Sequence, residues 1–148
     1  MIKTEVNKLA KASVSQVLVD RVARAVAEEL KLKKNYQVSL AIIADSLMTG
    51  LNKKYRKKDK TTDVLSFDNL DNDFIIPGEN DYLGEIFICY PQLVRQAKIN
   101  NRSQRAEFGL LFIHGLIHLL GKDHETSEKD AKFFDDKQQA ILKKLKLV

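Results

Sequence analysis

The alternation of hydrophobic and polar residues predicts secondary structure along the whole chain. Between Ser13 and about Asn35, valine and alanine recur every three or four residues among charged side chains, which predicts an amphipathic helix. Residues 38–44 form a run rich in β-branched side chains, typical of a strand that is buried on both faces. Three further strands are predicted at residues 1–7, 62–67 and 82–90.

Four more helices are predicted downstream of the first. Their expected starts are residue types that favour helix N-termini, namely Asp45 or Ser46, Pro91, Ser103 and Ser127. The helix after Ser103 is apolar on nearly every side, so we expect it to be central and buried. The pattern as a whole predicts an α+β fold, with one mixed sheet of about four strands and about five helices.

Length and composition limit the possible classes of protein. A chain of 148 residues fits one domain, so we expect a single domain over residues 1–148. The lone cysteine, Cys89, leaves no disulfide partner and suits a reducing cytoplasm, which is the expected location. No apolar leader stands at the N-terminus. The longest apolar stretch, residues 108–120, is too short to span a bilayer, so no membrane association is expected.

All three histidines of the chain fall within residues 114–124. His114 and His118 are four residues apart, so on a helix both rings project from one face. Gly121 is placed to end that helix and can adopt a left-handed conformation, which would return His124 toward the other two. Three imidazoles with a fourth position left for water are typical of catalytic zinc, which predicts one Zn2+ per chain. The alternative is a helix with two core histidines and an unrelated surface one.

The spacing H-x-x-x-H-x-x-G-x-x-H also occurs in the metzincin proteases. Those proteases carry a glutamate after the first histidine as the general base, and this chain has Gly115 there. They also need a methionine downstream of the histidines, whereas Met1 and Met48 both precede them. The zinc-binding spacing is therefore present without the peptidase base.

A basic cluster follows the second predicted helix. It comprises Lys53, Lys54, Arg56, Lys57, Lys58 and Lys60. Its charge, less that of Asp59, equals the formal net charge of +5 of the entire chain. Such a local excess is what a phosphate-binding patch needs, but a solvated loop has the same composition. Glu85, inside an apolar predicted strand, needs a partner, which is either a structural hydrogen bond or a contact behind a metal-binding histidine.

Three motifs occur in order along nearly the whole chain. They are L-N-x-x-Y-R-x-x-D-x-x-T-D-V-L-S-F from Leu51, L-G-E-I from Leu83, and H-G-x-x-H-L-x-G-x-D-H from His114. Together they resemble the YbeY family of bacterial zinc-dependent endoribonucleases, which mature ribosomal RNA. The resemblance implies single-stranded RNA, ribosomal RNA or the small ribosomal subunit as partners. It implies maturation of the 3′ end of 16S rRNA and ribosome quality control as functions.

The resemblance also implies roles for individual residues. It places zinc on His114, His118 and His124 and makes Arg56 the catalytic arginine. The candidate substrate-binding residues are Lys53, Lys54, Lys57, Lys58 and Ser66, and Glu85 and Asp123 are candidates to orient a ligand or water. Two alternatives share these features. One is a metallopeptidase-like zinc hydrolase, and the other is a non-catalytic ribosome assembly factor whose structural metal takes a fourth ligand from Asp123 or Glu125.

Overall fold

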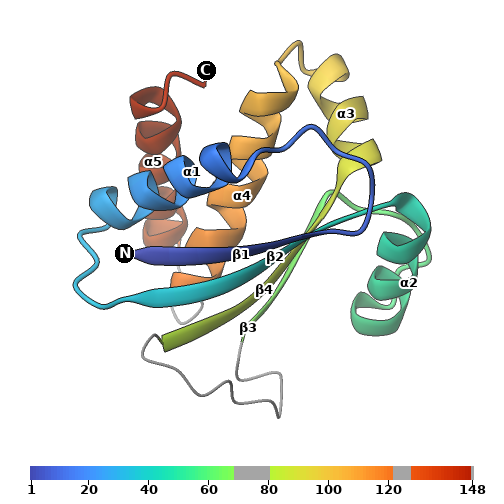
Figure 1. Ribbon diagram of the computed structural model, residues 1–148, viewed down its shortest axis with the longest axis horizontal. Coiled ribbons are helices and arrows are strands. Elements are labelled where there is room, and N and C mark those ends of the chain that lie inside the picture. The colour runs from blue at the N-terminus through green and yellow to red at the C-terminus, as the bar shows by residue number, and fades with distance from the viewer. Residues whose placement is uncertain (69–80, 122–127, 148) are drawn as a thin grey trace.

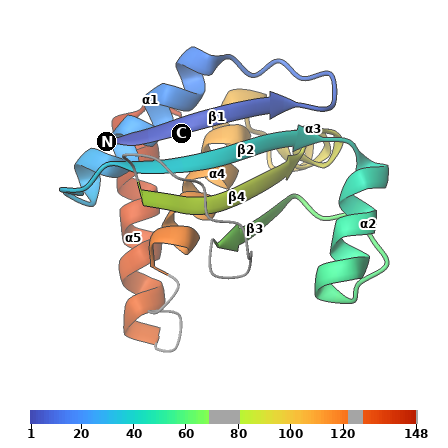
Figure 2. The ribbon, with the colours of Figure 1, turned by 60° about the horizontal axis from the view of Figure 1, so that its bottom comes forward.

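The computed structural model of the chain describes residues 1–68, 81–121 and 128–147. Its centre is a four-stranded sheet in the order β1-β2-β4-β3 (Figures 1 and 2). The strands are β1 (Ile2–Lys8), β2 (Tyr36–Ile43), β3 (Val64–Asp68) and β4 (Asp81–Cys89). Strands β1, β2 and β4 run parallel and β3 runs antiparallel at one edge, so the predicted mixed sheet is confirmed.

Helices cover the two faces of the sheet unequally. The helices are α1 (Gln16–Glu29), α2 (Asp45–Arg56), α3 (Tyr90–Ile99), α4 (Gln104–Leu120) and α5 (Glu128–Lys144). Helices α1, α4 and α5 lie together on one face, and α2 lies at one end of the other (Figure 1). The large core therefore sits under α1, α4 and α5. A smaller core of Ile43, Met48, Leu65 and Cys89 lies under α2.

The predicted central helix is confirmed in α4. Phe108, Phe112, Ile113 and Leu116 of this helix are at most 1% exposed. Ser103 caps it as predicted, since its Oγ accepts a hydrogen bond from the amide of Ala106 at 3.0 Å. No helix within the described ranges is both long enough and apolar enough to cross a membrane.

Two predicted helix ends differ from the structure. Helix α1 ends at Glu29, well before Asn35, and Lys31 just beyond it adopts a left-handed φ of 53° that stops the helix. Neither Asp45 nor Ser46 caps α2, because the capping position is Ala44, which offers no side-chain hydrogen bond. Asp45 lies in the first turn of α2 instead. The predicted start at Ser127 lies outside the described residues.

Candidate active site

The two described histidines lie close together on α4. His114 is exposed and His118 is half-buried, and their ring centroids are 6.4 Å apart with the planes inclined by 31°. The four-residue spacing therefore places both imidazoles on one helix face, as expected. His124 and Asp123 lie outside the described residues. Within the described ranges there is no group of three or more histidine, cysteine, aspartate or glutamate side chains that could hold a metal. The three-histidine site stays a prediction.

Gly121 ends α4, but not in the conformation we expected. Its amide donates to the carbonyl of Ile117 at 2.8 Å, and its φ of −121° is not left-handed. The glycine is required for a different reason: a Cβ atom at this position would collide with the ring of Phe134 on α5. A missing side chain thus allows α5 to pack against the end of the histidine helix.

Gly115, the residue after the first histidine, faces the sheet. A Cβ atom built there would lie 3.1 Å from both the Cδ1 and the Cγ2 of Ile86 on β4, closer than most real contacts of this kind. Ile86 is itself fully buried. Any side chain at the position where metzincins carry their base would therefore require Ile86 to shift by a few tenths of an ångström, and this close packing of helix on sheet accounts for the glycine.

Arg56, the last residue of α2, reaches β3, the edge strand of the described sheet. Its Nη2 donates to the carbonyl oxygen of Ser66 on β3 at 3.2 Å, and its guanidinium lies 4.9 Å from the centroid of the Phe67 ring. In an antiparallel pair, the backbone groups of successive residues point alternately toward and away from the partner strand. Asp63 points toward β4, because its carbonyl accepts a hydrogen bond from the amide of Cys89. The carbonyl of Ser66 therefore points away from β4 and is available to Arg56. Strand β3 thus contacts the guanidinium through the carbonyl of Ser66 and the ring of Phe67.

Arg56 and the histidine helix are connected through the sheet. Ser66 pairs directly with Ile86 across β3 and β4. Ile86 in turn packs against Gly115 of α4. The strand that orients Arg56 is therefore a direct neighbour of the strand on which the histidine helix rests.

Glu85 lies on the other face of the sheet from α4. Its neighbour Ile86 points at Gly115, and successive side chains of a strand point to opposite faces. Glu85 lines an open cavity of about 510 Å³ on the far face, together with Ser39 and Phe87. A contact between Glu85 and a histidine of α4 would have to cross the sheet, so we do not propose one.

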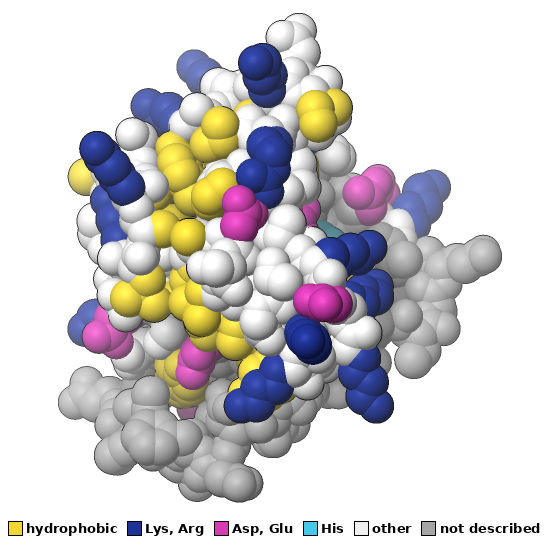
Figure 3. Space-filling view, turned by 90° about the vertical axis from the view of Figure 1, so that its right-hand side faces the viewer, with side chains coloured by type: hydrophobic (Ala, Val, Ile, Leu, Met, Phe, Trp, Pro, Cys, Tyr) yellow, Lys and Arg dark blue, Asp and Glu magenta, His cyan; other side chains and the backbone are white. Residues whose placement is uncertain are grey.

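The basic cluster is a solvent-facing patch at the end of α2. All six of its lysine and arginine residues are exposed, and among the described residues none of the five lysines forms an ion pair. Buried Asn52 holds the segment in place, because its amide donates to the carbonyl of Lys60 at 2.9 Å. On this side of the molecule, Lys and Arg side chains gather next to a histidine that reaches the surface (Figure 3).

A hydrogen-bonded carboxylate anchors the other end of α2. Asp45 receives two bonds from Arg95 of α3, at 3.1 and 2.7 Å. Thr61 and Cys89 bond the same carboxylate at 3.2 and 3.3 Å. The bond from Arg95 is the main reason that the pKa of Asp45 is lowered to about 2, while burial raises the pKa of the Cys89 thiol. Sequence reasoning missed this anchor, because no local signal pairs residues so far apart.

A chain of polar side chains that includes the buried Glu107 joins the start of α4 to the start of β3. Glu107 is 1% exposed and accepts bonds from Arg102 and Gln96, each at 3.1 Å. Gln96 also donates to Asp63 at 3.2 Å, and the other oxygen of Asp63 accepts from the amide of Val64 at 2.7 Å. The sequence shows none of these links. They fix the Arg56-binding strand relative to the histidine helix.

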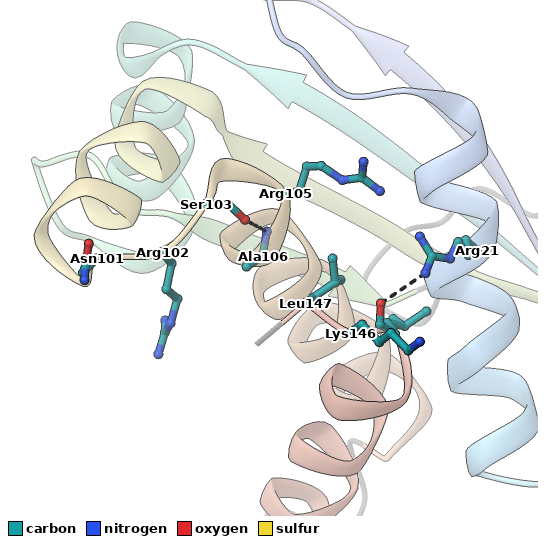
Figure 4. A pocket seen from close by; sticks show the side chains of 9 residues that line it. Arg21, Asn101, Arg102, Ser103, Arg105, Ala106, Lys146 and Leu147 are labelled. Atoms are coloured by element: carbon teal, nitrogen blue, oxygen red, sulfur yellow. Dashed lines mark hydrogen bonds between the residues drawn. The ribbon is translucent and has the colours of Figure 1, made fainter.

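A second cavity of about 510 Å³ lies at the opposite end of α4 (Figure 4). It is lined by Arg21, Asn101, Arg102, Ser103, Arg105, Ala106, Leu145, Lys146 and Leu147. Arg21 closes one side by donating to the carbonyl of Leu145 at 3.1 Å. None of the predicted site residues that the structure describes lines this cavity, so it is separate from His114, His118 and Arg56.

The chain shares its α+β fold with a protein of known structure. It superposes on the solution structure of TM1509 from Thermotoga maritima with a TM-score of 0.63, over 96% of this chain and 87% of that one, at 26% sequence identity.

Sequence relatives define the family. The family model "Endoribonuclease YbeY" matches residues 1–146. An endoribonuclease YbeY of Syntrophomonas wolfei is 35% identical, covering 99% of this chain and 97% of the relative. One of Finegoldia magna is 41% identical over 75% of this chain and 70% of the relative. The chain therefore belongs to the endoribonuclease YbeY family, which confirms the resemblance seen in its motifs.

Proposed function

We propose that the chain is a zinc-dependent endoribonuclease that cleaves single-stranded RNA during ribosomal RNA processing, at the 3′ end of 16S rRNA, and serves ribosome quality control. Its expected location is the cytoplasm, and its expected partner is ribosomal RNA or the small ribosomal subunit. The observation that supports this best is the pair of imidazoles on one face of α4 in a chain of an endoribonuclease family.

One zinc ion per chain would be held by His114, His118 and, outside the described residues, His124. Imidazole nitrogen is a preferred zinc ligand, and two such donors already share one helix face. When bound, the ion supplies a hydroxide at neutral pH and polarises a phosphoryl oxygen. To Asp123 we assign the orientation of a ligand or of the water.

Arg56 would bind the scissile phosphate. Its guanidinium is planar and carries five N–H donors. Two bonds to backbone carbonyls, of Tyr55 at 3.4 Å and Ser66 at 3.2 Å, leave further donors for phosphate oxygens. Because the edge strand orients the group before substrate arrives, it can stabilise the charge that develops in the transition state without reorganising. Lysine lacks this planar geometry.

The surrounding lysines would bind the RNA backbone. Lys53, Lys54, Lys57 and Lys58 are exposed and would act as point charges on phosphates away from the reacting one. Ser66 stays a candidate substrate-binding residue. Its carbonyl oxygen also orients Arg56, because it accepts a hydrogen bond from the guanidinium.

The packing of Gly115 favours RNA over peptide as the substrate. A metzincin-like peptidase needs a general base after the first histidine, whereas this chain has Gly115 there, packed closely against Ile86. In the proposed site, Arg56 would stabilise charge at the scissile phosphate, and a metal held by the histidines would supply the nucleophile that a general base supplies in a peptidase.

Parallel cleavage assays test the proposal. Zinc-loaded protein should cut a single-stranded RNA oligomer and leave an unfolded peptide intact, and a chelator should stop RNA cleavage. Chelator-sensitive proteolysis by a rigorously purified sample, without RNA cleavage, would reverse the assignment. RNA binding without any cleavage would instead support a ribosome assembly factor with a structural metal.

A further inference from the structure

An exposed aromatic ring stands within the basic patch. Tyr55 is 49% exposed and lies on the last turn of α2, between Lys54 and Arg56 in the sequence. The Nζ of Lys54 lies 5.1 Å from its ring centroid. Single exposed apolar side chains are common on proteins, but Tyr55 is flanked in the sequence by the exposed cations Lys53, Lys54, Arg56, Lys57 and Lys58.

Other aromatic side chains pack between the Tyr55 ring and the small core under α2. Phe67 packs edge-on against Tyr55, with centroids 5.1 Å apart, and Phe87 packs against Phe67 in the same way at 5.8 Å. Phe67 and Phe87 adjoin the small core under α2. Phe67 also lies under the guanidinium of Arg56. One aromatic group thus fixes both the exposed ring and the arginine, so neither has to be ordered when a ligand binds.

We infer that Tyr55 is a stacking platform for one unpaired nucleobase of the RNA, next to the phosphate that Arg56 contacts. An aromatic ring among cations matches the two components of single-stranded nucleic acid, which are π-faced bases and a phosphate backbone. The inference rests on the proposed function, because it names the part of the RNA that this surface takes.

Stacking on Tyr55 explains a preference for single strands. In a duplex both faces of every internal base are covered by neighbouring bases, so the ring has no partner along the paired region. Every base has a π-face, so Tyr55 selects unpaired over paired RNA without selecting a sequence.

The chain contains no tryptophan, so Tyr55→Trp introduces a single fluorescent reporter at the proposed platform. Binding of a single-stranded RNA oligomer should quench this fluorescence strongly, recorded by stopped flow before cleavage. Polyphosphate, which has charge and no bases, should bind without comparable quenching, and so should duplex RNA. Tyr55→Ala should weaken single-strand affinity about 5- to 100-fold. Tyr55→Phe, which keeps the ring, should bind like the parent protein.

Ile99→Trp provides the matched control. Ile99 is 81% exposed, follows Lys98 and ends α3, whose free end lies away from α2 (Figure 1). RNA that quenches Tyr55→Trp and not Ile99→Trp supports the platform. Equal quenching at both positions, or none at Tyr55→Trp while anisotropy shows bound RNA, overturns it. A failure of the proposed function would look different, because the parent protein itself would then neither bind nor cut RNA.

Discussion

Adding a single methyl group at Gly115 measures how closely the histidine helix approaches the sheet. In a helix interior, glycine to alanine gains about 1 kcal/mol of helix propensity. At Gly115 the added Cβ would meet two carbons of Ile86 at 3.1 Å, and crowding a packed core costs about 1–3 kcal/mol. The two effects leave Gly115→Ala between about as stable as the parent and about 2 kcal/mol less stable.

Gly50→Ala is the control that isolates the propensity term. Gly50 lies inside α2, and a Cβ atom there would have nothing within 4 Å. The Gly50→Ala substitution should therefore stabilise the protein by up to about 1 kcal/mol. Urea unfolding of both variants should place Gly115→Ala below Gly50→Ala by about 1–3 kcal/mol with unchanged m-values. Ile86→Ala should relieve the crowding, so the double variant should lose less stability than the two single losses added together.

Equal stability of Gly115→Ala and Gly50→Ala would refute this reasoning. The helix would then have space beside Ile86, and the steric argument against a glutamate at Gly115 would fail. If crowding is present, Gly115→Glu should lose stability further and acquire no peptidase activity.

Variants of Arg56, of the lysines around it and of Asp45 test the contacts around α2. Arg56→Ala should lower the turnover of saturating RNA about a hundredfold or more, and Arg56→Lys should recover little of it, because the bidentate geometry is lost. Neutralising Lys53, Lys54, Lys57 and Lys58 together should instead weaken binding and flatten its salt dependence, so an Arg56→Ala variant that behaves in this way contradicts the catalytic assignment. For Asp45, the pKa of about 2 in the folded protein lies below the unfolded value of about 3.9. Its bond to Arg95 therefore stabilises the fold fully above about pH 4, and that contribution declines below that pH and is lost as the pH falls through about 2. Because both side chains are more than 40% exposed, Asp45→Asn should cost less than about 1 kcal/mol at pH 7, and this cost should shrink as the pH falls through about 2, so a cost that is independent of pH contradicts the ion pair.

The sequence predicts the elements of the fold better than their contacts. The apolar run of α4 and the cap at Ser103 are local signals, and the structure contains both. The reason for Gly121 is not local, because it depends on Phe134 of another helix. The face of Glu85 could not be read from the alternation either, since Ile86 and Phe87 are both apolar although they point to opposite sides of the sheet.

The same limit applies to the candidate site. The four-residue spacing of His114 and His118 predicts their shared face without any tertiary information. The support of Arg56 by Ser66 and Phe67 requires the register of an edge strand, which no periodicity gives. The bond between Asp45 and Arg95 joins two helices that only the folded sheet brings together.

The zinc content of purified protein tests the central claim most directly. We predict about one zinc per chain in the parent protein. His118→Ala should lose the metal together with RNA cleavage, because two remaining imidazoles make a poor site. His114→Ala and His124→Ala should behave alike. Full zinc occupancy in all three variants would contradict the account, because the metal would then be held by other residues.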